Sequence, residues 1–321
     1  ADSPGGATRD GLRQGYFHGD PDRQVALAVG WRQRYHIHIM ADNFSKRRYL
    51  LNFDTQRLGQ VFTDVLVIGS GVAGLRAAIA AAEQANVVVA MKDGLADCNT
   101  TYAQGGVAVV TDAADSIAAH VADTLQVGWG LGHREVVETM AREGPTCLDE
   151  LRCWGAKFDV ENGEVARGME GGHSARRVVH ALGDATGLEL GRTLARRASE
   201  SERIRLFDHC YVVDVVVEDG RCIAALTHHP KYGYQIIWAK ETILAAGGGG
   251  CVFRETTNPP SATADGPAIA FRAGAKLRDM EFFQFHPTAL YIAGASRALI
   301  SEAVRGEGAY LVDRHGDRFM A

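Results

Sequence analysis

Three glycines, Gly69, Gly71 and Gly74, follow directly on the apolar run Val65 to Ile68 and are spaced two and three residues apart. A short run of apolar residues is typical of a parallel strand buried on both faces. At the end of such a strand, the first glycine permits a tight turn and the second lets the backbone approach a pyrophosphate. The third lets the following helix pack closely on the strand. The pattern therefore predicts a dinucleotide site, with the phosphates at the start of a helix.

The flanking sequence supplies the elements that this site needs. Residues 72–85 (VAGLRAAIAAAEQA) are dense in strong helix formers, and residues 86–91 (NVVVAM) predict the next strand. An acidic residue at the end of that strand would bind ribose hydroxyls, but this strand ends in Met91, Lys92 and Asp93. Lys92 can approach the ribose or a phosphate, with Asp93 as the neighbouring alternative, or it can be a solvated strand end. A glycine turn without a ligand is the plain alternative to the whole motif.

A second polar stretch, residues 98–110 (CNTTYAQGGVAVV), combines hydroxyls, an amide and two adjacent glycines. Such residues are costly in a core but suit a loop that binds a polar ligand through backbone amides. Further along, four glycines at residues 247–250 let the backbone pass close to a ligand. Asp265 stands before Gly266 and a helical segment, a position that is also typical of a plain N-cap.

The middle of the chain is rich in β-forming residues. Strands are predicted over residues 204–207, 212–217, 223–227 and 234–239, with an Asp-Gly hairpin turn at residues 218–221. These runs predict an antiparallel meander inserted in the nucleotide-binding domain. Residues 242–246 (TILAA) are then expected to return as a separate buried strand.

Composition limits the classes of function. A chain of 321 residues with 46% hydrophobic residues can bury a sizeable core, and this length suggests about two domains. A net charge of −5 provides no basic field for nucleic acid or an anionic membrane. No apolar run approaches the roughly 18 residues that span a bilayer, and no secretory signal pattern is present, so we expect a cytoplasmic protein. The six cysteines show no CxxC spacing, so we expect no bound metal and reduced thiols.

Five blocks in a fixed order resemble one family. They are GSGVAG (69–74) with TTYAQGG (100–106), EGGHSARRVVHALGDATG (170–187), TTNPPSATADGPAIAFRAGA (256–275), EFFQFHPTAL (281–290) and SEAVRGEGAYL (301–311). Over residues 61–321 the chain resembles the flavoprotein family that comprises L-aspartate oxidase and the flavoprotein subunits of succinate dehydrogenase and fumarate reductase. The resemblance implies an α/β fold, with a Rossmann-like FAD-binding domain that contains the meander and with the start of a capping domain.

The resemblance also implies that FAD is bound without a covalent bond. Respiratory members tether the flavin through a histidine in the loop before AQGG, and this chain has Asn99 at that position. Covalent attachment there is therefore excluded. Tyr211 and Val212 would contact the adenine through backbone groups. The full set of expected cofactor contacts is Gly69, Ser70, Gly71, Val72, Ala73, Gly74, Lys92, Asn99, Thr100, Thr101, Tyr102, Ala103, Gln104, Gly105, Gly106, Tyr211, Val212 and Asp265.

Within the family, the tyrosine of TYAQGG and the block RGMEGGHSARR (167–177) resemble the aspartate-oxidising branch. The implied reaction is FAD-dependent oxidation of L-aspartate to iminoaspartate, with oxygen or fumarate as electron acceptor. This would be the first step of NAD biosynthesis, with quinolinate synthase as a downstream partner. Hydride transfer requires that both carboxylates of the substrate are held in a fixed geometry.

By this resemblance, a group of polar and charged side chains binds or orients the substrate. His286, with the hydroxyls of Thr288 and Ser301, would bind a carboxylate. Glu170 would accept a hydrogen bond from the substrate ammonium, which a dicarboxylate without an amine does not need. The plain alternatives are a core histidine for His286 and a surface ion pair with a nearby arginine for Glu170. Glu302 and Arg305 would form the opposite wall of the substrate site. The expected set of catalytic residues is Glu170, His286, Ser301, Glu302 and Arg305.

The expected organisation has three segments. Residues 1–60 form a partly disordered N-terminal extension in which Met40 is a plausible start, residues 61–285 the FAD-binding domain, and residues 286–321 an incomplete capping domain. Family members continue further and carry a catalytic arginine in that continuation. We therefore expect this chain alone to bind FAD weakly or not at all and to lack oxidase activity. The alternatives are a soluble fumarate reductase or succinate dehydrogenase flavoprotein and a non-catalytic FAD-binding fragment.

Overall fold

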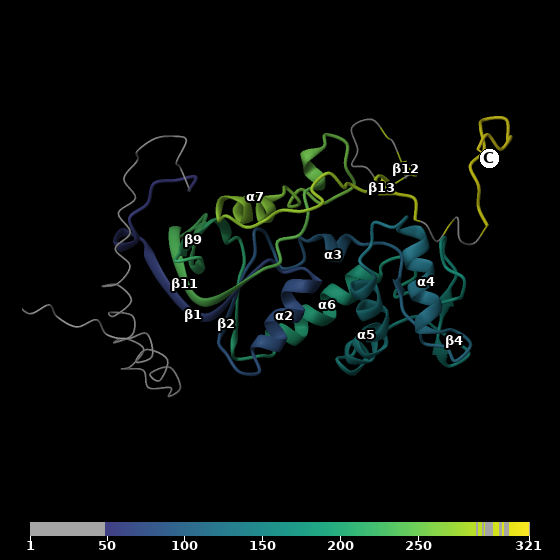
Figure 1. Cartoon of the computed structure of the whole chain (residues 1–321), viewed down its shortest axis with the longest axis horizontal. Helices are drawn as coiled ribbons and strands as arrows, with labels where there is room; N and C mark the ends of the chain where they lie inside the picture. Colours follow the sequence, from purple (N-terminus) through teal and green to yellow (C-terminus); the bar gives the residue numbers. More distant parts are fainter. Residues whose placement is uncertain are drawn as a thin grey trace, which may run out of the picture.

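The computed structural model describes residues 49–286, 288–290, 292, 298–301, 304 and 308–320 (Figure 1). None of the described helices is both long enough and apolar enough to cross a bilayer. The helices are η3 (Thr55–Arg57), α2 (Val72–Ala81), α3 (Asn99–Tyr102), α4 (Ile117–Val127), α5 (Arg134–Cys153), α6 (Thr186–Ser199), η4 (Gly250–Val252) and α7 (Asp265–Arg272). The strands are β1 (Gly59–Ile68), β2 (Val87–Ala90), β3 (Val107–Ala108), β4 (Val160–Glu161), β5 (Glu164–Val165), β6 (Arg167–Gly168), β7 (Val178–Val179), β8 (Ile204–Phe207), β9 (Tyr211–Glu218), β10 (Arg221–His229), β11 (Gly233–Leu244), β12 (Ala289–Leu290) and β13 (Ala298–Leu299).

A six-stranded sheet in the order β8-β2-β1-β11-β10-β9 forms the centre of the fold. The first four strands in this order are parallel, and β10 pairs antiparallel with both of its neighbours. Helix α2 connects β1 to its parallel neighbour β2, which completes the β-α-β unit that the glycine pattern predicts. The predicted α/β fold class is therefore confirmed.

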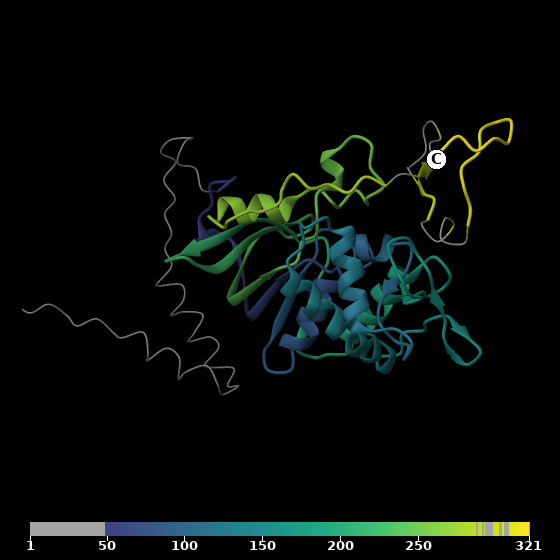
Figure 2. The same ribbon diagram turned by 45° about the vertical axis from the view of Figure 1, so that its right-hand side comes forward.

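The alternating side chains of the parallel strands are buried on both faces of this sheet. Leu66 and Val88 point to the face that packs against Ile269 of α7. Val67 and Val89 point to the opposite face, where α2 and α6 lie. Figures 1 and 2 show α7 above the sheet and α2 and α6 on its other side. Burial on both faces explains why these strands are continuous apolar runs.

Three element predictions need correction. The helix predicted over residues 72–85 ends at Ala81, and turns follow. The strand at residues 204–207 pairs parallel with β2 and is not part of the antiparallel meander. Residues 234–239 and 242–246 were expected as separate strands, but β11 runs unbroken from Gly233 to Leu244. The polar residues Lys240 and Glu241 suggest that the strand ends there. In the structure the Lys240 ammonium pairs with Asp64 on β1, and the pairing of β11 with β1 continues past it.

The Asp-Gly hairpin between β9 and β10 is confirmed. Asp219 and Gly220 have φ values of 50° and 75°. Positive φ at both central residues matches the right-handed twist of the flanking strands, and it explains why Asp and Gly stand there.

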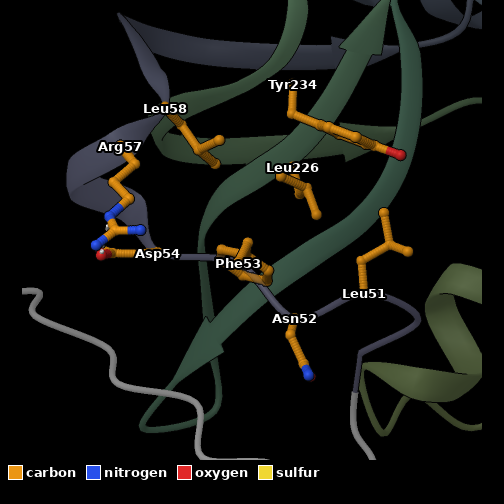
Figure 3. A pocket seen from close by; sticks show the side chains of 8 residues that line it. All are labelled: Leu51, Asn52, Phe53, Asp54, Arg57, Leu58, Leu226 and Tyr234. Atoms are coloured by element: carbon orange, nitrogen blue, oxygen red, sulfur yellow. Dashed lines mark ion pairs between the residues drawn. The ribbon is translucent and has the colours of Figure 1, made fainter.

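Residues that the sequence assigns to an N-terminal extension pack on the sheet. Strand β1 begins at Gly59, before the expected domain boundary at residue 61. Phe53 and Leu58 pack against a cluster that includes Val216 and Trp238. Figure 3 shows residues 51–54, Arg57 and Leu58 beside Leu226 of β10 and Tyr234 of β11, with which they line a surface pocket. Residues 1–48 of the expected partly disordered extension lie outside the described residues.

Candidate functional site

A cavity of about 270 Å³ opens at the carboxyl ends of β1 and β2. This is the edge at which open parallel sheets bind ligands. Of the residues expected to bind the cofactor, those that line the cavity are Gly69, Ser70, Gly71, Val72, Ala73, Lys92, Asn99, Thr100, Tyr211, Val212 and Asp265. Asp93, the alternative to Lys92, lines it as well. The remaining expected residues lie outside the lining and are Gly74, Thr101, Tyr102, Ala103, Gln104, Gly105 and Gly106.

The glycine turn has the tight packing that its pattern predicts. Gly69 has a φ of +111°, and a Cβ there would lie 2.3 Å from the carbonyl oxygen of Ala245 on the neighbouring chain segment. A Cβ on Gly74 would lie 2.0 Å from the carbonyl oxygen of Gly69. Gly74 therefore serves helix packing and not the cavity surface. The backbone N–H of Val72, in the first turn of α2, donates to the Thr100 hydroxyl at 2.9 Å, so the helix start and the polar loop meet at the cavity.

Lys92 is not a solvated strand end. Its ammonium donates to the Thr263 hydroxyl at 2.6 Å and to Asp265 at 2.8 Å, across 173 residues of sequence. The Tyr211 hydroxyl donates to the other Asp265 oxygen at 3.2 Å. Burial raises the pKa of Asp265, but the hydrogen bonds from Lys92 and Thr263 outweigh this effect and lower it. Asp265 is the first residue of α7 and Ala264 is the N-cap, so the plain N-cap interpretation of Asp265 is wrong.

The polar loop at residues 98–106 divides into two parts. Asn99 and Thr100 belong to the short helix α3 and face the cavity. The following part packs against the start of α6, where a Cβ on Gly187 would lie 2.0 Å from the carbonyl oxygen of Thr100. The backbone N–H of Gly187 donates to the carbonyl of Ala103 at 3.1 Å. The second half of the loop is thus fixed by protein contacts beside the cavity.

Asp184 is a residue of the site that the sequence did not single out. It accepts hydrogen bonds from the Gly105 backbone N–H at 2.7 Å, the Gln104 amide at 3.2 Å and the Ser301 hydroxyl at 2.9 Å. It therefore joins the polar loop to the expected substrate residue Ser301. The block HALGDATG includes Asp184, but an aspartate close to the start of a helix is also typical of a capping residue.

A small sheet places Glu170 close to the end of the polar loop. Strand β7 pairs antiparallel with β3, which continues the loop, and with β6, which precedes Glu170. The Glu170 carboxylate lies 3.1 Å from Nε2 of His180, the residue after β7. The arginines near Glu170 are engaged elsewhere: Arg167 pairs with Asp112 and Glu164, Arg177 pairs with two other aspartates, and Arg176 donates to the Arg167 carbonyl. The plain alternative, an ion pair of Glu170 with a nearby arginine, is therefore wrong.

Strands β12 and β13, which stand between His286 and Ser301 in the sequence, pair antiparallel. The backbone N–H of Ile300 donates to the carbonyl of Thr288 at 3.1 Å, which places Thr288 beside the chain that enters Ser301. Nδ1 of His286 lies 2.9 Å from the Thr288 carbonyl oxygen, so this ring nitrogen is used within its own turn. The two remaining expected residues, Glu302 and Arg305, lie outside the described residues.

Arg177 anchors the segment that follows Glu170. Its guanidinium is fully buried and binds Asp115 through two hydrogen bonds of 2.8 Å each, and it also binds Asp123. Asp123, on α4, additionally accepts hydrogen bonds from the backbone N–H and the hydroxyl of Ser174, each at 2.8 Å. This network ties the loop at residues 169–177 to α4. The sequence indicated the arginines of the loop but not their partners.

Asp123 is expected to make stability depend on pH. Burial raises its pKa, but the hydrogen bonds from Ser174 and Arg177 outweigh this and lower it from 3.8 to about 2. A lowered pKa stabilises the fold above the unfolded value and loses that effect as pH falls through the folded value. Between pH 4 and pH 2, Asp123 should therefore remove about 2 kcal/mol from the free energy of unfolding, as measured by urea denaturation at a series of pH values. Asp123→Asn should remove this part of the pH dependence, whereas Asp149→Asn on the exposed face of α5 should retain it. Equal pH dependence in all three proteins would contradict the assignment.

The residues of the cavity fit a flavin dinucleotide. The Cβ positions of Gly247 and Gly248 meet no atom within 4 Å, which leaves open backbone along the cavity. The first N–H groups of α2 suit a pyrophosphate, and Gly71 admits close approach of the backbone. The Lys92 ammonium and the Asp265 carboxylate provide a donor and an acceptor for hydroxyl groups. In the described part of the chain, no three metal-binding side chains cluster.

Comparison with known proteins agrees with this fit. The family model described as an FAD binding domain matches residues 64–321. The L-aspartate oxidase of Bacillus subtilis is 43% identical over 258 residues, which are 80% of this chain and 48% of that protein. The L-aspartate oxidase of Mycobacterium bovis is 46% identical over 264 residues, 80% of this chain and 49% of that protein. The chain thus spans about half the length of the curated relatives that it matches.

Solved structures show the same fold. An Escherichia coli quinol fumarate reductase structure superposes with a TM-score of 0.76 at 33% identity, over 81% of this chain and 45% of that chain. A structure of Mycobacterium smegmatis Sdh1 in complex with UQ1 superposes with a TM-score of 0.72 at 34% identity, over 82% of this chain and 47% of that chain. The cofactor implied by the family is FAD. The chain therefore belongs to the FAD-binding domain family of the flavoproteins that include L-aspartate oxidase and the succinate dehydrogenase and fumarate reductase flavoproteins.

Proposed function

We propose that the protein oxidises L-aspartate to iminoaspartate with non-covalently bound FAD, and that this chain supplies the FAD-binding domain and the first substrate-binding residues. The observation that carries the proposal is the position of Glu170. It is a mostly buried carboxylate, bound to His180, and the small sheet places it near the end of the loop that leads from the cofactor cavity. A carboxylate of the protein does not favour binding of a dicarboxylate substrate unless that substrate also carries a positive charge. The ammonium of an amino dicarboxylate supplies that cation.

In this proposal the residues of the chain bind and orient. The start of α2, Lys92 and Asp265 hold the nucleotide part of FAD, which when bound accepts the hydride from the substrate. Ser301, anchored on Asp184, and the turn of His286 bind a substrate carboxylate, while Glu170 holds the ammonium. Three fixed points on one small substrate set the orientation that hydride transfer requires. Oxygen or fumarate as acceptor, a place in NAD biosynthesis and a cytoplasmic location are further parts of the proposal.

A second candidate function is a fumarate reductase or succinate dehydrogenase flavoprotein. The solved structures of that group, at 33% and 34% identity, favour it. Its substrates carry no amine, so Glu170 would have no substrate partner. Asn99 is compatible with both functions only if FAD is held without a covalent bond.

The proposal also includes the expected division of the chain into an FAD-binding domain at residues 61–285 and an incomplete capping domain at residues 286–321.

Glu170→Gln should separate the two functions. For the FAD-loaded protein we expect kcat/KM for L-aspartate to fall about 100-fold, because the charge-assisted hydrogen bond to the ammonium is lost. Fumarate reduction should change by less than about threefold, because fumarate has no amine. The measurement is anaerobic bleaching of flavin absorbance by L-aspartate, compared with steady-state fumarate reduction.

The matched control is Glu164→Gln, which removes an exposed carboxylate of the same segment that pairs with Arg167. It should leave both reactions unchanged. Bleaching of the unmodified protein by succinate but not by L-aspartate would instead assign it to the second candidate function. Bleaching by neither substrate, with FAD still bound, would favour the non-catalytic FAD-binding fragment.

A further inference from the structure

His180 lies between the polar loop and Glu170. Its Nε2 is 3.1 Å from the Glu170 carboxylate, and the two side chains are only 17% and 18% exposed. A Cβ on Gly106 would lie 2.8 Å from Nε2, and a Cβ on Gly168 would lie 3.0 Å from Cε1. The imidazole is therefore enclosed by two glycine backbones, one on each neighbouring segment. A side chain at either glycine would displace it.

The small sheet explains why these segments meet. Strand β7 lies in the middle of the order β3-β7-β6. The end of the polar loop enters β3, and His180 leaves β7, while Glu170 follows β6. Sheet pairing thus places Gly106 on one side of the imidazole and Gly168 and Glu170 on the other, next to paired strands and not on a free loop.

The chemistry of the contact assigns the proton. An ionised carboxylate only accepts hydrogen bonds, so Nε2 of His180 carries the hydrogen and donates to one Glu170 oxygen. Of the three arginines of the loop, Arg167 and Arg177 are paired with Asp112, Glu164, Asp115 and Asp123, and the exposed Arg176 donates to the carbonyl of Arg167. Among the described residues, His180 is the side chain that orients Glu170 and leaves its second oxygen for a ligand.

We propose that His180 is a positioning residue for amine recognition: it holds the Glu170 carboxylate so that the second oxygen faces the ammonium of an amino dicarboxylate. The inference rests on the proposed function and adds to it the residue that sets the preference for an amine-bearing substrate. His180 acts through Glu170 and need not contact the substrate. Its loss should therefore weaken ligands with an amine and spare ligands without one.

The test compares binding of L-aspartate and of succinate to the FAD-loaded protein. The flavin is first reduced under argon, so that L-aspartate cannot be oxidised and calorimetry reports Kd alone. His180→Phe, which keeps the ring but lacks the N–H, should weaken L-aspartate about tenfold. Succinate binding should stay within about twofold. His180→Gln, whose amide can donate to Glu170, should restore most of the L-aspartate affinity.

His228→Phe is the matched control, because it makes the same change on β10, where the ring contacts Tyr234 at a tilt. It should alter neither Kd. If His180→Phe fails to retain FAD, His180→Asn provides the second loss variant, since its amide is too short to reach Glu170. An equal loss for both ligands would mean that His180 only supports the fold, and no loss for either would mean that Glu170 is positioned without it; both results overturn the inference.

Glu170→Gln, measured in parallel, distinguishes the failure of this inference from the failure of the proposed function. If Glu170→Gln weakens L-aspartate selectively and His180→Phe does not, the inference about His180 falls and the proposed function stands. If neither variant changes the preference for L-aspartate over succinate, the site does not recognise an amine and both fall.

Discussion

Replacing Gly69 by alanine is expected to lower the free energy of unfolding by about 4 kcal/mol. Two effects add at this residue. Its φ of +111° is strained for any residue with a Cβ, and the added Cβ would lie 2.3 Å from the carbonyl oxygen of Ala245. Because the contact is with backbone, strand β1 and the segment after β11 would have to separate at the cavity. Urea denaturation measures the loss, and FAD retention on gel filtration reports the state of the cavity.

Gly233→Ala is the control for this prediction. Gly233 also has a positive φ, of +67°, but a Cβ there meets no atom within 4 Å. The substitution should therefore cost only the strain of the left-handed conformation, about 1 kcal/mol. A similar loss in both variants would show that the conformation alone matters and that the close approach of Ala245 does not.

Replacing Arg177 by methionine is expected to destabilise the protein by about 3 to 5 kcal/mol. The guanidinium is fully buried, and the Asp115 and Asp123 side chains that it binds are only 3% and 13% exposed. The hydrogen bonds from Arg177 lower the pKa of Asp115, so that carboxylate is ionised near neutral pH. Methionine fills the volume but leaves two carboxylates close together without a cation. Urea denaturation at pH 7 measures the loss.

The control for Arg177 is Arg134→Met, which breaks an exposed pair with Glu138 one helical turn away on α5. Such a pair contributes about 0.3 to 0.5 kcal/mol. The loss in Arg177→Met should also shrink at pH 3, where the orphaned carboxylates can take up protons. A loss below about 1 kcal/mol at pH 7 would mean that water reaches Asp115 and Asp123 and that the network does not anchor the loop at residues 169–177.

The nucleotide-binding half of the site could be predicted from the sequence because its geometry is local. The strand, the three glycines and the helix start lie within about twenty residues, and each residue type has one physical reason to stand where it does. The Asp-Gly turn between β9 and β10 is predictable for the same reason, since positive φ at both positions selects those residues. The strand break at Lys240 was wrongly predicted because its partner, Asp64, is far away in sequence.

The polar partners could not be predicted, because they depend on how distant segments meet. Lys92 binds Asp265, which is 173 residues away in the sequence, and Asp184 binds Ser301, which is 117 residues away. A charge in a loop has many possible partners, and only packing selects one. Glu170 illustrates this point: the sequence offers three arginines in its own loop, yet the sheet of β3, β7 and β6 places a histidine beside it.

The sequence by itself predicted a dinucleotide site at the end of β1 and showed that the chain resembles flavoproteins acting on dicarboxylates. Both conclusions rest on short patterns whose backbone conformation is set by residues next to one another. The tertiary structure decided which side chains face the cavity, which arginine is buried and which residue holds Glu170. These depend on strand order and helix packing, which bring together residues that no local pattern links.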